Sequence, residues 1–210
     1  WVWETDTLPA AMGRAQQGFD EIWTPSHHSA RAIERSVACP VHVLPHALDL
    51  AGIDAACADR AAFGLPEDGL VIGFAFDPHS MVERKNVAGL VEAFEAAFRK
   101  DDNCWLVLKV NHTGHRSYAL QDALSRVRSS RVLVAQQVLG RGETFSFIRS
   151  LDAYASLHRA EGFGLTCAEA MACGLPVVAS GDSGNLDFMT AHNSLLVPTT
   201  VVQTDRPHGP

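Results

Sequence analysis

Two glutamates separated by seven residues frame the segment whose residue types are best suited to bind a ligand. Glu161 follows a predicted strand, and Glu169 lies in the helix predicted after it. A carboxylate at a strand end can accept hydrogen bonds from sugar hydroxyls, and one in the next helix can reach the vicinal hydroxyls of a ribose. The alternatives are a solvated loop acid at Glu161 and a Glu169 that only closes a capping box with Thr166.

The turn between these acids has the composition of a phosphate-binding loop. Gly162 and Gly164 connect the predicted strand 153–157 to a helix that is expected to begin at Thr166. Glycines let a ligand approach the backbone closely, and the amides that open the helix, such as that of Leu165, favour an anion. A tight turn without a ligand is the alternative.

A pair of adjacent cations, Arg84 and Lys85, follows the polar loop that begins at Asp77. This loop leaves the predicted strand 71–76 at its carboxyl end. An arginine fork and a mobile lysine charge beside the cap of the next helix, at Asn86, can neutralise a diphosphate. Read alone, the pair is equally compatible with a solvated basic surface.

Small residues after a later strand offer a further anion site. In the run Gly181–Asn185, successive amides around Ser183 and Gly184 could form an anion-binding nest, and a bare turn explains the run equally well. His158, at the end of the strand 153–157, could approach a bound sugar or have no role in binding a ligand.

Strand-like and helix-like segments alternate along the chain, which predicts an α/β fold: a Rossmann-like parallel sheet with helices on both faces. The strands are expected at 21–23, 41–44, 71–76, 105–110, 131–135, 153–157 and 176–180. The helices are expected at 26–35, 87–98, 118–128, 143–150 and 166–173. In such sheets ligands bind at the carboxyl ends of strands, so the loops described above are expected to meet there.

Composition narrows the class of protein. The 210 residues carry a net charge of −7, which argues against a nucleic-acid partner. No apolar run is long enough to predict a membrane-spanning helix. The five cysteines are scattered along the chain, which favours reduced thiols in a cytoplasmic protein. The sequence has neither cysteines and histidines at zinc-binding spacing nor an Asp-x-Asp pair. No metal site and no cofactor are therefore predicted.

These motifs occur in an order that resembles a known family. The run Glu161-Gly-Phe-Gly164 with Glu169 and Gly174-Leu-Pro176 is similar to the signature of family-four retaining glycosyltransferases of the GT-B type. Arg84–Lys85–Asn86 is similar to the basic loop of that family. The segments 154–159 and 183–188 resemble a bacterial subgroup that builds cell-surface polysaccharides. The likeness extends from about Asp20 to Val197.

The resemblance implies half of a GT-B fold, in a chain too short to be the whole enzyme. Residues 1–49 would end the N-terminal acceptor-side domain, 50–69 would be an interdomain linker, 70–198 the nucleotide-sugar donor-binding domain and 199–210 an irregular tail. Relatives carry Gly–Arg where this chain has Phe76–Asp77, so the basic charge falls on Arg84 and Lys85.

The function that the resemblance implies is transfer of a hexose, with mannose as one candidate, from a GDP- or UDP-sugar to a glycan or lipid-linked sugar. Arg84 and Lys85 would stabilise the diphosphate, Glu161 would hold the sugar and Glu169 the ribose. The remaining donor-binding residues are expected to be His158, Gly162, Phe163, Gly164, Leu165, Thr166, Ser183, Gly184 and Asn185.

The chain by itself is expected to bind the donor and to turn it over poorly. A cytoplasmic location is expected, compatible with attachment of the N-terminal domain to the inner face of the membrane. Three alternatives stay open: a nucleotide-sugar epimerase and a sugar phosphorylase of the same architecture, and a non-catalytic nucleotide-binding module. Product analysis with the donor alone separates the other enzymes from a transferase.

Overall fold

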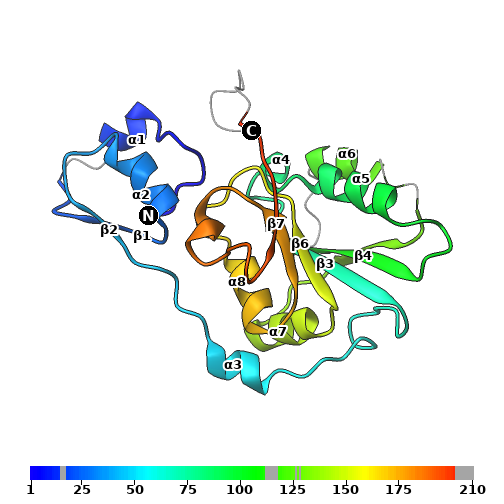
Figure 1. Cartoon of the computed structure of the whole chain (residues 1–210). Helices are drawn as coiled ribbons and strands as arrows, with labels where there is room; N and C mark the ends of the chain where they lie inside the picture. The colour runs from blue at the N-terminus through cyan, green and yellow to red at the C-terminus, as the bar shows by residue number, and fades with distance from the viewer. Residues whose placement is uncertain (15–17, 112–117, 126, 128, 202–210) are drawn as a thin grey trace.

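The larger of two sheets has six parallel strands. In the computed structural model, which describes residues 1–14, 18–111, 118–125, 127 and 129–201, their order is β5-β4-β3-β6-β7-β8 (Figure 1). The strands are β3 (Leu70–Phe76), β4 (Cys104–Val110), β5 (Val132–Gln136), β6 (Ala153–Ser156), β7 (Val177–Ser180) and β8 (Leu195–Val197). The prediction of a parallel α/β sheet is confirmed. The short edge strand β8 was not predicted.

Helices cover both faces of this sheet, as the alternating pattern predicted. Helices α5 (Val87–Ala97) and α6 (Tyr118–Ser125) lie over one face, and α7 (Arg141–Arg149) and α8 (Leu165–Ala172) lie over the other (Figure 1). Strands β3 and β4 are apolar along almost their whole length because both of their faces are buried.

The direction of the connections reverses between β3 and β6. From β3 the chain proceeds to β4 and β5, whereas from β6 it proceeds to β7 and β8 on the opposite side. The two strands are direct neighbours, with Ile72 paired to Ala153. A crevice opens at the carboxyl ends of strands at such a reversal, and ligands of open α/β sheets bind there. The loops after β3 and β6 carry the predicted basic pair and Glu161.

Residues 1–14 and 18–49 carry the second, two-stranded sheet and are called the small unit below. Its helices are α1 (Ala10–Arg14) and α2 (His27–Glu34), and its strands β1 (Ile22–Thr24) and β2 (Val41–Val43) pair in parallel. The Oγ of Ser26 accepts a hydrogen bond from the Ser29 amide and so caps α2, as predicted. An extended segment leads from β2 to α3 (Leu50–Ala55), which lies beside α7 (Figure 1).

The expected linker is anchored to the larger unit along its whole length. The Arg149 Nε donates to the Ile53 carbonyl in α3 at 2.9 Å. Arg60 Nη2 pairs with Asp152 Oδ2 at 2.6 Å, and the same oxygen accepts the Val71 amide at 2.7 Å. These contacts lie at the amino ends of β3 and β6, so residues 50–69 leave the opposite edge, at the carboxyl ends of these strands, open.

Candidate functional site

Arg84 and Lys85 lie on a one-turn helix, α4 (Val82–Lys85), where the sequence predicted a loop. Asn86 follows with a left-handed backbone (φ 53°), which asparagine tolerates better than most residues. Its Nδ2 donates to the Leu157 carbonyl at 2.8 Å and makes no capping bond to α5. Asn86 is the N-cap residue of α5, as predicted, but its side chain makes no capping bond and instead joins α4 to the end of β6.

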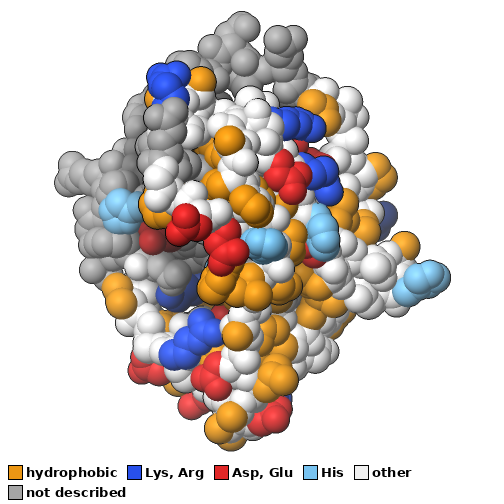
Figure 2. Space-filling view, turned by 90° about the vertical axis from the view of Figure 1, so that its left-hand side faces the viewer, with side chains coloured by type: hydrophobic (Ala, Val, Ile, Leu, Met, Phe, Trp, Pro, Cys, Tyr) orange, Lys and Arg blue, Asp and Glu red, His pale blue; other side chains and the backbone are white. Residues whose placement is uncertain are grey.

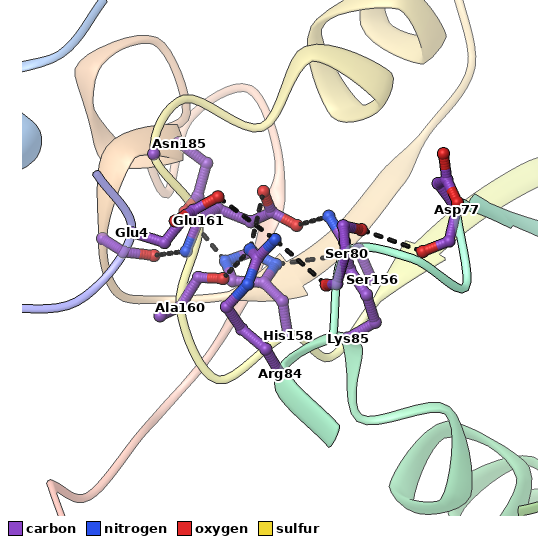
Figure 3. Close-up of polar contacts among 12 residues, drawn as sticks. Glu4, Asp77, Ser80, Arg84, Lys85, Ser156, His158, Ala160, Glu161 and Asn185 are labelled. Atoms are coloured by element: carbon purple, nitrogen blue, oxygen red, sulfur yellow. Dashed lines mark hydrogen bonds and ion pairs between the residues drawn. The ribbon is translucent and has the colours of Figure 1, made fainter. Parts of the chain in front are cut away.

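The structure brings the three residues predicted to be catalytic into direct contact. Lys85 Nζ donates to Glu161 Oε1, and Arg84 Nη1 lies 3.3 Å from Glu161 Oε2 (Figure 3). The two cations come from the loop after β3 and the acid from the loop after β6. The cluster therefore occupies the crevice where the direction of the connections reverses.

The two cations determine the ionisation of Glu161. Burial by itself would raise the pKa of this carboxyl group, because it disfavours the charged form. The positive charges of Lys85 and Arg84 outweigh that effect, so the pKa of Glu161 lies below its ordinary value. Glu161 is ionised at neutral pH and can only accept hydrogen bonds.

This lowered pKa predicts a specific pH dependence of stability. A folded-state pKa below the unfolded value means that the ionised carboxylate stabilises the fold at neutral pH and that this contribution is lost as the pH falls through the folded-state pKa. Urea unfolding of Glu161→Gln should therefore show lower stability than the wild type at pH 7, with the gap closing below pH 4.5. Glu34→Gln, on the exposed face of α2, is the control. A gap that stayed constant down to pH 3 would contradict the assignment.

Arg84 is engaged by the protein on several sides. Only 4% of the residue is exposed. Nη1 donates to the Ala160 carbonyl at 2.7 Å and Nη2 to the Ser80 carbonyl at 3.3 Å, and Nη2 also lies 3.3 Å from Glu4 Oε1. Arg84 thus holds the two loops together behind Glu161. The Lys85 ammonium, which pairs with Glu161 and stands on a long flexible stem, is the charge that can move toward a ligand.

The helix after Glu161 begins one residue earlier than predicted. Gly164 adopts a left-handed backbone (φ 86°) and is the N-cap residue of α8, which starts at Leu165. Thr166 therefore lies inside the helix, and its predicted capping box with Glu169 does not form. Because the first amides of a helix have no partner within it, those of Leu165 and Thr166 present a positive helix end to the crevice.

Glu169 is an almost buried acid without a fitting hydrogen-bond donor. Only 3% of it is exposed. Arg141 Nη1 lies 2.8 Å from its Oε1, but not in line for a hydrogen bond, so that oxygen has no hydrogen-bond partner among the described residues. Burial raises the pKa of Glu169, and Arg141 offsets the rise in part. An oxygen in this state is an acceptor for a hydroxyl group brought by a ligand.

Gly162 serves contacts within the protein. Its carbonyl accepts hydrogen bonds from Ser26 Oγ at 2.5 Å and Ser29 Oγ at 3.2 Å, both on the small unit. A Cβ atom on Gly162 would overlap Val2, and one on Gly184 would overlap the Gly162 carbonyl. The sequence predicted that Gly162 admits a ligand to the backbone; the structure shows it admitting a neighbouring loop and the N-terminal segment.

The segment 181–185, predicted to form an anion nest, instead hydrogen-bonds to the backbone of Glu161. The Gly181 amide donates to the Val197 carbonyl at 2.8 Å and the Gly184 amide to the Glu161 carbonyl at 2.9 Å. Ser183 Oγ accepts the Glu161 amide at 3.0 Å. The nest prediction was wrong for the amides of Gly181 and Gly184, because neighbouring backbone groups already satisfy them.

His158 and Asn185 form a buried polar link behind the site. His158 Nδ1 lies 3.0 Å from Ser156 Oγ, and its Nε2 lies 3.0 Å from Asn185 Oδ1. The amide group of Asn185 donates to the Ser180 carbonyl at 2.9 Å. Burial lowers the pKa of His158. The pair ties the end of β6 to the loop after β7, so these side chains position loops and offer few free atoms to a ligand.

Phe163 is also turned into the protein. It is buried, and its ring makes an edge contact with His46 at 5.2 Å between centroids and a tilted contact with Phe188 at 5.1 Å. His46 belongs to the segment after β2. Phe163 therefore contributes to the packing of the small unit against the loops after β6 and β7.

Sequence reasoning missed four polar residues of the site. Glu4, Ser26 and Ser29 reach it from the small unit, and Arg141 reaches Glu169 from the start of α7. Ser26 carried a signal only as a helix cap. No pattern in the sequence distinguished the other three from ordinary surface residues.

The described residues carry neither a membrane-spanning helix nor a metal-binding cluster. No helix in that part of the chain is long and apolar enough to cross a membrane. The same residues contain no group of three or more histidine, cysteine or acidic side chains arranged to hold a metal ion.

Solved structures share this fold. Sucrose-phosphate synthase from Thermosynechococcus elongatus superposes with a TM-score of 0.70 and 22% identity over 89% of this chain and 47% of its own. HepE from Anabaena, in complex with UDP and glucose, gives a TM-score of 0.73 and 18% identity over 91% of this chain and 54% of its own. A trehalose-6-phosphate protein from E. coli, bound with UDP-2-fluoro glucose, superposes with a TM-score of 0.69 and 13% identity. The match covers 91% of this chain and 52% of that protein.

The chain spans about half the length of these structures. No curated protein sequence matches it at a significant level. The family model for glycosyl transferases group 1 matches residues 58–204, which include α4, the Glu161 turn and α8. The chain therefore belongs to the glycosyl transferases group 1 family and carries a GT-B-type, Rossmann-like glycosyltransferase fold.

Proposed function

We propose that this chain is the donor-binding part of a retaining glycosyltransferase that moves a hexose from a GDP- or UDP-sugar to a glycan or lipid-linked sugar. The observation that carries the proposal is the Lys85–Glu161 ion pair in the crevice between β3 and β6, beside the positive end of α8. This pair supports the proposal because a cation on a flexible stem and an ionised carboxylate lie beside the first amides of α8.

Glycosyl transfer from such a donor develops negative charge on the diphosphate that leaves. Stabilising that charge is the main task of the protein. In the proposed mechanism Lys85 leaves Glu161 and moves to the diphosphate, while the amides of Leu165 and Thr166 approach it from the helix end. Arg84, fixed behind Glu161, adds its charge without changing its contacts.

The two acids would then orient the donor. Once Lys85 has moved, Glu161 has a free oxygen with which to accept hydroxyl groups of the transferred sugar. Glu169 would accept a ribose hydroxyl at the oxygen that has no aligned hydrogen-bond donor. Retention of configuration and a role in bacterial polysaccharide synthesis rest on the resemblance of the Glu161–Glu169 segment to family-four enzymes.

The first experiment measures whether the chain binds the product nucleotide. Calorimetric titration with UDP and with GDP is expected to show binding of one of them, and Glu161→Ala should leave that affinity within about threefold, since Glu161 is assigned to the sugar. Binding of neither nucleotide would remove the proposal. Equal binding of adenine and uracil nucleotides would point to a general nucleotide-binding module.

The second experiment separates the classes of enzyme. The nucleotide sugar that binds is incubated with the chain, first alone and then with a panel of methyl glycosides, and the products are identified by mass spectrometry. A transferase yields a new glycoside only with an acceptor. Conversion of the donor without any acceptor would favour an epimerase instead.

A further inference from the structure

Two serines in the first turn of α2 converge on one backbone carbonyl in the loop after β6. Ser26 Oγ donates to the Gly162 carbonyl at 2.5 Å, and Ser29 Oγ lies 3.2 Å from the same oxygen. Both serines are fully buried. A buried carbonyl group needs a hydrogen-bond donor from within the protein, and here the small unit supplies it. The small unit therefore holds a peptide group that lies one residue beyond Glu161.

The same turn of α2 also contacts the loop after β7. The His27 amide donates to Asp187 Oδ2 at 2.8 Å, and His27 Nδ1 lies 3.0 Å from that oxygen. Asp187 is the last residue of the 3₁₀ helix η1 (Gly184–Asp187). A carboxylate at the start of a helix is stabilised by the partial positive charge of the first amides. The start of α2 thus joins two loops of the larger unit, on the side of the molecule where acidic and histidine side chains gather (Figure 2).

These two loops determine the backbone position of Glu161. Ser183 Oγ accepts the Glu161 amide at 3.0 Å, and the Gly184 amide, at the start of η1, donates to the Glu161 carbonyl at 2.9 Å. The backbone sets the direction in which a side chain leaves the chain, and binding residues have to stay within about 0.5 Å of their productive geometry. The position of the Glu161 carboxylate therefore depends on how α2 holds Gly162 and Asp187.

The small unit reaches Glu161 by a third route, through Arg84. Glu4 Oε1 lies 3.3 Å from Arg84 Nη2, and Arg84 Nη1 lies 3.3 Å from Glu161 Oε2. In the proposed mechanism Lys85 leaves Glu161, so Arg84 and the backbone contacts then hold the carboxylate in place for the sugar. Each of these remaining contacts leads back to the small unit.

We infer that Ser26 and Asp187 are positioning residues for Glu161, and that they couple the contact between the two units to the binding of the transferred sugar. The inference rests on the proposed function, because that function assigns the sugar to Glu161. Binding of the diphosphate should be largely independent of this contact, since α8 packs on its own strands, β6 and β7.

Calorimetric titration of the chain tests the inference with UDP and UDP-glucose, and with GDP and GDP-mannose. The measured quantity is the ratio of the dissociation constant of the nucleotide sugar to that of its nucleoside diphosphate. Ser26→Gly removes the hydroxyl donor, and glycine is well tolerated as an N-cap residue, so α2 should persist. The ratio should rise about fivefold, as expected for one lost hydrogen bond, with affinity for the diphosphate within about twofold of the wild type. Ser26→Thr, which keeps a hydroxyl group, should restore the wild-type ratio.

A double variant separates positioning from a general structural defect. If Ser26 acts through Glu161, Ser26→Gly should have no further effect on the ratio once Glu161→Ala has removed the carboxylate, so the two changes should not be additive. A rise by the same factor in the wild type and in Glu161→Ala would overturn the inference.

Two further variants complete the experiment. Ser194→Gly is the matched control, because Ser194 Oγ donates to the Thr190 carbonyl at 2.7 Å near the amino end of β8, and it should leave the ratio unchanged. Asp187→Ala leaves the sequence of α2 intact and should raise the ratio as Ser26→Gly does. An unchanged ratio in either folded variant would reject this inference alone. Failure of the wild type to bind these ligands, or a ratio that Glu161→Ala does not alter, would instead reject the proposed function.

Discussion

Lys85→Met is expected to reduce affinity for the nucleoside diphosphate by about 10²-fold, because removing one partner of a buried charged contact typically costs 2–5 kcal/mol. Affinity for the nucleoside without phosphates should change little, since the proposed contact of Lys85 is with the diphosphate. Calorimetry with UDP and uridine, or GDP and guanosine, measures both. A loss shared equally by nucleoside and diphosphate would indicate a general structural defect.

Lys100→Met is the matched control for this prediction. Lys100 is exposed beyond the end of α5, and its replacement removes the same charge without touching the crevice. The diphosphate should bind this variant as it binds the wild type. If both lysine variants lost affinity to the same extent, the effect would reflect net charge rather than the pair formed by Lys85 and Glu161.

Glu169→Met is expected to lower nucleotide affinity by about 10-fold to 10²-fold and to make the folded chain more stable. Glu169 is buried with an oxygen that has no aligned hydrogen-bond donor, and burial raises its pKa, so its ionised form opposes folding at pH 7. Methionine fills a similar volume without a charge. Residues kept for binding often reduce stability in this way.

Deoxyribose analogues test whether the nucleotide affinity that Glu169→Met loses comes from contacts with the ribose hydroxyls. The wild type should bind UDP or GDP more tightly than the 2′-deoxy or 3′-deoxy form, and Glu169→Met should bind all three alike. Glu67→Gln, at an exposed turn, should retain the preference and the wild-type stability. A Glu169→Met variant that still discriminated against a deoxyribose would show that another group reads the hydroxyls.

The pattern of the sequence was sufficient to predict the sheet and the cluster of charges. Strands such as β3 and β4 are long apolar runs between polar loops, and their burial on both faces follows from that composition. Arg84, Lys85 and Glu161 could be placed together because each follows a parallel strand at its carboxyl end, and such ends share one edge of the sheet.

Local chemistry near the turns was less predictable, because alternative partners compete for the same polar groups. Asn86 is a good capping residue by type, yet the Leu157 carbonyl takes its side chain. Thr166 and Glu169 have the spacing of a capping box, yet Gly164 in a left-handed conformation starts the helix earlier. Which partner prevails depends on neighbours distant in sequence, and the local pattern does not contain them.

The sequence by itself determined the class of fold and the charges that meet at the carboxyl edge of the sheet, since these follow from periodicity and from residue type. Only the tertiary structure decided that Arg84 is enclosed by carbonyl groups, that the Gly184 amide braces Glu161 and that Glu4 and Ser26 arrive from another unit. The physical reason is that hydrogen-bond partners are assigned by packing between distant segments, and a buried polar group takes whichever partner the packing provides.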